Sequence, residues 1–466
     1  MRRYYLVTLL LYSIAMCIDV DAAAWSSFPR FRHVWRTHHR KNESVESPDP
    51  PKSRSQTINL QNGGGRPNHA AAGREKRRKS GNSRLASASL SRSKVIAITL
   101  ILFLVFPLLT LVRFPNNICP GSNGENGTCV AASECSQRGG ASSGICANGY
   151  GICCIVTATC GETIVNNNTY FVNPKYPSTY DGTISCQLTL VKSHPNVCQF
   201  RLDFVQFNIR GPETTNHQCI YDQFIVSGGN PVPAICGTNA GNHVYVDAGL
   251  GQTNPVTLTF VTSGSFARSW KIRVSQIRCD SIYRAEEGCL QYFTGISGQI
   301  KSFNYDPVTG LQLSNQDYSV CVRTERNFCG IQYVTCPVDD RLGEAATTGG
   351  TVAAQTMRSN AFTLTGNTQS TQIASMTGAA CQTDWLTIPC ASNVGRSPTA
   401  TMSCVDRLCG GTFNAESQNL NASSVMSTVK PFRLIFHTDS VEAPNDVGNR
   451  GFCLNYIQQP CTTKLR

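Results

Sequence analysis

Apolar and polar residues alternate in a series of short segments beyond residue 160. A period of two residues is typical of β-strands with one buried face, and glycine, proline and asparagine separate the segments as turn residues do. The segments are 188–191, 200–209, 221–229, 243–249, 256–264 and 270–279. No long stretch after residue 113 has the period of an amphipathic helix. The pattern therefore predicts a mostly β protein with a β-sandwich.

Two other segments are almost continuously apolar and bear on where the chain is located. Residues 1–24 have Arg2 and Arg3, an apolar stretch and then small residues, which is typical of a signal peptide. Residues 95–112 form a run of 18 residues without a charge, long enough to span a bilayer. If residues 1–24 were cleaved and 95–112 then stopped transfer, the C-terminal region would face the cytosol.

The basic residues help to decide how these segments act. The net charge of +12 lies entirely in residues 1–94, which hold 18 Lys and Arg against 6 Asp and Glu. Residues 25–94 are basic and poor in apolar residues, so we expect them to be disordered and to stay on the cytoplasmic side of a membrane. This favours a type II anchor at 95–112 with the C-terminal region outside the cell. The alternative is an internal signal peptide at 95–112 and a secreted protein.

The cysteines indicate an oxidising compartment for the rest of the chain. Of the 23 cysteines, 22 lie between Cys119 and Cys461, and none has the C-x-x-C spacing typical of zinc sites. An even number at this density predicts a disulfide framework. Glycosylation sequons begin at Asn126, Asn167 and Asn421. Residues 95–466 are neutral overall, with 23 Lys and Arg against 23 Asp and Glu, so charge gives no reason to expect a nucleic-acid partner.

The first six of these cysteines form a compact module, residues 117–154, with little room for an apolar core. They stand at positions 119, 129, 135, 146, 153 and 154. Disulfides must supply most of the stability of such a module. Six cysteines allow 15 pairings, and adjacent Cys153 and Cys154 must have different partners. The pattern, with Gly127-x-Cys129-Val130 and the terminal Cys-Cys pair, resembles a clip domain, the disulfide module found before many arthropod serine proteases.

The alternating segments that follow, residues 160–279, resemble a CUB domain, a jelly-roll β-sandwich of extracellular proteins. The resemblance rests on LDFVQF at 202–207, CIYDQFIVSGG at 219–229 and LTFVTSGSFARSW at 258–270. It implies disulfides Cys160–Cys186 and Cys219–Cys236, which leaves Cys198 and Cys279 to pair with each other.

Residues 288–461 repeat the theme and resemble a divergent CUB-like domain. The matching elements are GCLQYFTGISGQIKSFNYD at 288–306, CQTDWLTIPC at 381–390 and PFRLIFHTDS at 431–440. Ten cysteines would make five bridges here, and the stretch 337–380, rich in Thr, Ala, Gly and Ser, is expected to be an insertion or a mobile loop. The order of a small cysteine module and two CUB-like halves resembles arthropod CUB-domain proteins.

Motifs for catalysis are missing from the sequence. A trypsin-like domain needs its serine in Gly-Asp-Ser-Gly and its histidine in Ala-Ala-His-Cys, and neither string occurs. The HExxH motif is also missing. Beyond the apolar run the histidines are His194, His217, His243 and His437, which we expect to be ordinary surface or sheet residues. We therefore do not expect an enzyme.

The CUB resemblance implies where to look for calcium, because many CUB domains bind this ion through an acidic cluster at one end of the sandwich. Calcium needs several hard oxygen ligands, so each missing carboxylate weakens a site. In the first domain Asp222 matches one acidic position, but Arg210 lies near the second and Ser263 replaces the third. We therefore expect no calcium there, and Asp222 is interpreted as a turn or strand-end residue.

The second domain keeps more of the acidic positions. Asp384 matches the position of Asp222, Asp439 matches the acid that the first domain lacks, and Glu442 is close enough to assist. These three residues are the candidate calcium ligands, and the alternative is that they are surface acids. No other cofactor is expected.

These features together predict a non-catalytic extracellular or cell-surface glycoprotein. Its partner would be an extracellular protein or glycan recognised by loops of the CUB-like sandwiches, an inference from fold alone. The alternative function is that of a regulator or cofactor of an extracellular serine-protease cascade, in which the clip-like module docks a protease.

Overall fold

The computed structural model describes residues 112–249, 255–337, 360–365, 374–394, 404–442 and 449–461. Residues 1–111 lie outside the described residues. They include the segments 1–24 and 25–94 and all of the apolar run 95–112 except Val112. In the described part, strands dominate and the one α-helix, α3 (Ala132–Gln137), is short. Eleven disulfides join all 22 cysteines from Cys119 to Cys461.

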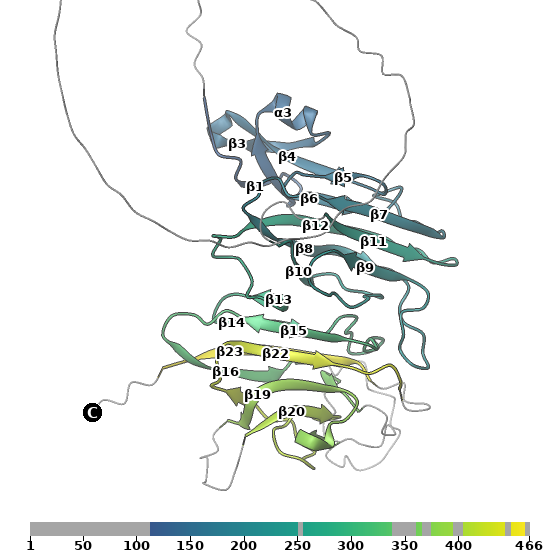
Figure 1. Cartoon of the computed structure of the whole chain (residues 1–466), viewed down its shortest axis with the longest axis vertical. Helices are drawn as coiled ribbons and strands as arrows, with labels where there is room; N and C mark the ends of the chain where they lie inside the picture. The colour runs from purple at the N-terminus through teal and green to yellow at the C-terminus, as the bar shows by residue number, and fades with distance from the viewer. Residues whose placement is uncertain are drawn as a thin grey trace, which may run out of the picture. The chain divides into compact units, whose positions relative to one another are not determined.

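The disulfide-rich module is a small sheet with α3 beside it (Figure 1). Its strands are β1 (Ile118–Pro120), β2 (Asn126–Val130), β3 (Ala141–Cys146) and β4 (Gly151–Ala158). Its bridges are Cys119–Cys153, Cys129–Cys146 and Cys135–Cys154. Neighbouring side chains on a strand point to opposite faces, so Cys153 and Cys154 of β4 reach different partners.

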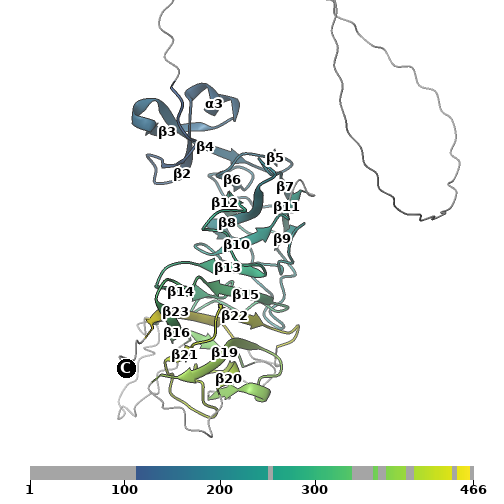
Figure 2. The same ribbon diagram turned by 60° about the vertical axis from the view of Figure 1, so that its left-hand side comes forward.

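The first sandwich consists of two mostly antiparallel sheets that enclose an aromatic core. Its strands are β5 (Thr163–Ile164), β6 (Thr169–Val172), β7 (Ile184–Leu190), β8 (Val197–Asn208), β9 (Gln223–Ser227), β10 (His243–Asp247), β11 (Val256–Thr262) and β12 (Ser269–Arg278). One sheet has the order β6-β12-β8-β10 and the other β5-β7-β11-β9, with β5 and β7 paired in parallel (Figure 1, Figure 2). Trp270 stacks on Phe260 at 4.1 Å between the ring centroids in this core.

The module and the first sandwich share a sheet. Strand β4 pairs in parallel with β6, so the order β1-β2-β4 continues into β6-β12-β8-β10. Buried Lys271 of β12 strengthens the connection, because its ammonium group contacts Glu125 of the module and lies 2.9 Å from the Tyr176 hydroxyl. The module therefore extends the first sandwich and is not a separate domain.

The described residues of the second sandwich form eleven strands, and strand β19 crosses between its two halves. The strands are β13 (Cys289–Phe293), β14 (Ser297–Lys301), β15 (Asp317–Val322), β16 (Phe328–Thr335), β17 (Phe362–Thr363), β18 (Ser375–Thr377), β19 (Trp385–Asn393), β20 (Val405–Gly410), β21 (Val425–Ser427), β22 (Phe432–His437) and β23 (Gly451–Pro460). The start of β19 pairs with β22 and its end pairs with β21. Part of the stretch expected as an insertion joins the sheet, because buried Phe362 of β17 pairs with Phe452 of β23.

Candidate functional site

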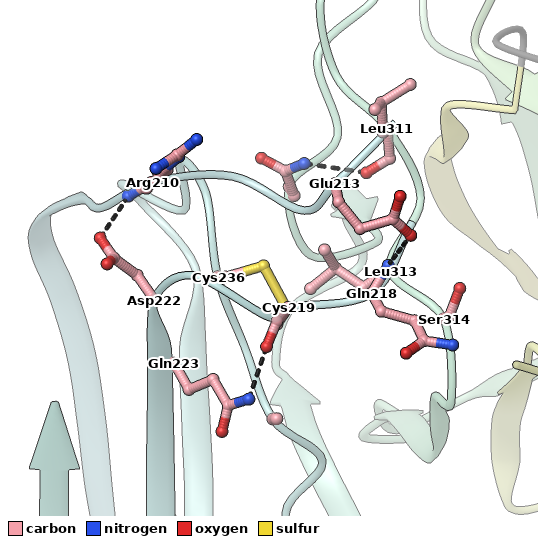
Figure 3. Close-up of a disulfide and its surroundings, with 12 residues drawn as sticks. Arg210, Glu213, Gln218, Cys219, Asp222, Gln223, Cys236, Leu311, Leu313 and Ser314 are labelled. Carbon is pink, nitrogen blue, oxygen red and sulfur yellow. Dashed lines mark hydrogen bonds between the residues drawn. A yellow bond between two sulfur atoms is a disulfide. The ribbon is translucent and has the colours of Figure 1, made fainter. Parts of the chain in front are cut away.

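A buried ion pair occupies the end of the first sandwich where the acidic positions were sought. Asp222, directly before β9, and Arg268, directly before β12, are both fully buried. Arg268 donates from Nε to Asp222 Oδ2 at 2.6 Å and from Nη2 to Oδ1 at 2.9 Å. The backbone amide of Arg210 donates to Asp222 Oδ2 at 2.7 Å, a bond drawn in Figure 3. The backbone amide of Ser263 donates to Asp222 Oδ1 at 3.1 Å.

Arg268 therefore supplies a cation from the chain itself. It also donates to the carbonyl oxygens of Gly182, Ser263 and Phe266, so one guanidinium ties the backbone at Gly182 and the loop between β11 and β12 to Asp222. Charge-assisted bidentate bonds of this kind fix geometry strongly. Asp222 does stand at a strand end, as expected, and its basic partner is Arg268 rather than Arg210, the arginine near the second acidic position. The Arg210 guanidinium instead lies 3.5 Å from the centre of the Tyr221 ring.

At the corresponding end of the second sandwich the structure brings together Asp384 and Glu442. Asp384 and Glu442 are buried, so Asp384 is not a surface acid, whereas Asp439 is half-buried. Gln312 lies between the two buried carboxylates and donates from Nε2 to Asp384 Oδ2 at 2.9 Å and to Glu442 Oε1 at 2.7 Å. Asn449 donates to the other oxygen of Glu442 at 2.7 Å.

Asp439, the third candidate ligand, contacts the Asp384 carboxylate through its backbone amide. Its amide donates to Asp384 Oδ1 at 3.0 Å, and its own carboxylate accepts the Val441 amide at 2.9 Å. Burial and the nearby charge of Glu442 raise the pKa of Asp384 to about 7, although the Asp439 and Gln312 donors act in the opposite direction.

This arrangement does not fit a calcium ion. Calcium takes oxygen ligands, whereas N–H donors occupy the carboxylate oxygens of Asp384 and Glu442. Within the described ranges, no group of three or more His, Cys, Asp and Glu side chains is placed to hold a metal. Calcium binding by Asp384, Asp439 and Glu442 is untested, and the N–H donors on the Asp384 and Glu442 carboxylates argue against it.

A histidine from the first sandwich closes the acidic cluster. His217, in the loop 210–222, is fully buried, and its Nδ1 lies 3.2 Å from Glu442 Oε1 without hydrogen-bond alignment. The His217 carbonyl accepts the Ser314 amide at 3.1 Å. Figure 3 shows this loop, with Glu213 and Gln218, beside Leu313 and Ser314 of the second sandwich. The expectation that His217 is a surface or sheet residue is wrong, because the partner that buries it comes from a distant part of the chain.

Other contacts extend the junction between the two sandwiches. The Asn304 amide donates to Asn239 Oδ1 at 2.7 Å, and the Tyr292 amide donates to His243 Nε2 at 3.1 Å. Burial, followed by the charge of Arg201, lowers the pKa of His243 to about 4. The two sandwiches are therefore joined by buried polar bonds, and the acidic positions of both lie at or beside this junction.

The remaining candidate residues are the cysteines of the first sandwich and the asparagines of the three glycosylation sequons. The structure contains the bridges Cys160–Cys186, Cys219–Cys236 and Cys198–Cys279, the three that the resemblance implies. Of the sequons, Asn421 is exposed, whereas Asn126 and Asn167 are half-buried. The Asn167 side-chain oxygen accepts the Gln276 amide at 2.7 Å.

Comparison with known domain families identifies both sandwiches. Residues 160–273 match the CUB domain, and residues 286–459 match the animal CUB domain. The chain therefore contains two CUB domains preceded by a disulfide-rich module, which confirms the predicted fold class. Neither matched family is a catalytic domain, and no protein of a curated set matches the chain.

Several solved structures are similar to this chain. The CUB1-EGF-CUB2 domains of rat MASP-1 are 13% identical with a TM-score of 0.21, covering 65% of this chain and 99% of that one. The CUB1-EGF-CUB2 domain of human MASP-1/3 is 15% identical with a TM-score of 0.20, covering 63% and 100%. The full extracellular region of zebrafish Gpr126/Adgrg6 is 12% identical with a TM-score of 0.22, covering 66% and 38%.

Proposed function

We propose that this protein is a non-catalytic binding protein that acts outside the cell and recognises a partner through loops of its CUB domains. Two CUB domains and a framework of disulfides support an extracellular setting. Each acidic position that could have held a cation is engaged by groups of the chain itself. Recognition would therefore use the loops that surround the junction rather than its buried centre.

The observation that carries this proposal is an exposed apolar edge, here called the junction rim, formed by Ile220 and Val441. Gln218 Nε2 donates to the Ser440 carbonyl at 2.9 Å and so holds the two loops together. Ile220 and Val441, close to this bond in sequence, are 57% and 47% exposed. Exposed apolar side chains beside an arginine stacked on Tyr221 are typical of a protein-binding surface, so a protein partner is favoured over a glycan.

We further propose that the chain is displayed on the cell surface by a type II anchor at residues 95–112, with secretion after cleavage of that run as the alternative. Within the described residues no helix is long and apolar enough to cross a membrane. The excess of basic residues before the run supports the proposed orientation. The clip-like identity of residues 117–154 is also a proposal and rests on the cysteine pattern.

Proximity labelling on intact insect cells tests the binding function. The full chain would carry a C-terminal peroxidase, and three forms would be compared: wild type, Ile220→Asp with Val441→Asp, and the control Leu420→Asp, which changes an exposed leucine of the second CUB domain. We expect a set of extracellular proteins labelled by wild type and control but lost with the rim variant. Equal labelling by all three forms would contradict the proposal, and a labelled serine protease would favour the cascade-regulator alternative.

A further inference from the structure

The disulfide-rich module has a surface cavity of about 390 Å³ at the point where the described chain begins. Its lining includes Val112, Phe114, Ile118, Tyr150 and the Cys129–Cys146 bridge, and no residue of the lining is charged. Ile118 and Tyr150 are 59% and 66% exposed. A neutral, apolar and exposed concavity of this kind marks an interaction surface.

The segment that leads into this cavity is held firmly on the module. The Phe114 ring packs on Gly151 so closely that a Cβ at residue 151 would lie 2.8 Å from a ring atom. The Asn117 carbonyl accepts the Cys129 amide at 2.8 Å, and Ile118 begins β1. Residues from Phe114 onward therefore belong to the module and do not act as a loose tether.

The sequence on the other side of Val112 is the uncharged apolar run 95–112. From Val112 to Phe114 the chain spans two residues, which cover at most about 7 Å. If the run crosses a bilayer, the cavity must therefore lie at the membrane surface. Tyrosine is enriched at that depth, and an exposed Arg113 can reach lipid phosphates while its stem follows the apolar surface.

We propose that the cavity, together with Ile118 and Tyr150, is a membrane-docking patch that rests in the interfacial layer of the phospholipid bilayer holding residues 95–112. The proposal depends on the cell-surface display proposed above. Because β4 of the module pairs with β6, the patch would also fix how the first CUB domain stands on the membrane.

Photo-crosslinking in the full chain tests the patch. Benzoylphenylalanine would replace Tyr150 or Ile118, with the exposed Leu420 as the control position. Intact cells would be irradiated, and the adducts on the purified chain would be identified by mass spectrometry. All three positions are exposed, so the substitutions leave buried packing unchanged. The membrane pellet after alkaline extraction and the N-terminal sequence of the product would be recorded in parallel.

Phospholipid adducts at positions 150 and 118, several-fold above position 420, would support the patch. Protein adducts at 150, or no lipid adduct on a chain that resists alkaline extraction, would overturn the patch while leaving the proposed display intact. A product in the medium that begins near Phe114 would overturn both, because no bilayer would then adjoin the cavity.

Discussion

Replacing Arg268 by methionine should destabilise the first CUB domain more than any surface change. The guanidinium makes two hydrogen bonds to Asp222 and three to backbone carbonyl groups, and all would be lost. Asp222 would keep two backbone amides but would be a buried charge without a counter-ion. Removing one partner of a buried ion pair costs about 3–5 kcal/mol. Arg268→Lys should recover part of this loss, because lysine keeps the charge but cannot form the bidentate pair.

Hydrogen–deuterium exchange of the β12 amides in the full chain is the suitable assay, because a multidomain protein need not unfold in two states. A loss of this size accelerates exchange by a factor between about 10² and about 4 × 10³, since each 1.4 kcal/mol is a factor of ten. Arg278→Met is the matched control. Arg278 also pairs with an aspartate, Asp280 at 3.0 Å, but both are exposed, so no change is expected.

Two results would refute this reasoning. One is equal exchange in Arg268→Met and Arg278→Met, which would mean that the buried pair does not hold the domain together. The other is additivity in a double-mutant cycle with Asp222→Asn. The account predicts that the double variant loses less than the sum of the single losses, because it leaves no unpaired buried charge.

Three further predictions concern pH, calcium and glycosylation. The folded protein keeps His243 neutral down to about pH 4, whereas the unfolded chain protonates it near 6.5, so stability should fall as the pH drops through this window. Melting temperatures measured from about pH 7 to about pH 4.5, which covers most of the interval between the two pKa values of His243, should fall in wild type. An equal fall in His243→Gln would show that His243 is not its cause. Chelation should leave the melting temperature unchanged, because N–H donors occupy Asp384 and Glu442; a decrease that Asp384→Asn abolishes would instead support calcium. Asn421 is exposed and should carry a glycan, so Asn421→Gln should increase gel mobility, and unchanged mobility would contradict glycosylation at this site.

Sequence alone predicted most strands of the first CUB domain, because each buries one face and so shows the period of two. The segments 200–209 and 270–279 became β8 and β12 with nearly the same bounds. Strand β6 was not predicted, because Thr169–Val172 is buried on both faces and shows no alternation. Strand β17 was missed because two residues are too short for any period.

The site was predicted less well, because its contacts join residues that are distant in the sequence. The positions of Asp222, Asp384 and Glu442 could be found from the resemblance, but their partners could not. Arg268 lies 46 residues from Asp222, and His217 meets a carboxylate from the other CUB domain. No local pattern distinguishes such residues from surface arginines and histidines.

The junction between the two CUB domains buries the acidic positions and leaves the junction rim exposed for a partner. Three amides report on it, those of Tyr292, Asn304 and Ser314, because each donates to an acceptor in the other CUB domain. Hydrogen–deuterium exchange of the full chain measures them together. We predict that these three amides exchange as slowly as the β12 amides. Exchange at the rate of exposed loops, with β12 still protected, would show that the domains separate and would contradict this prediction.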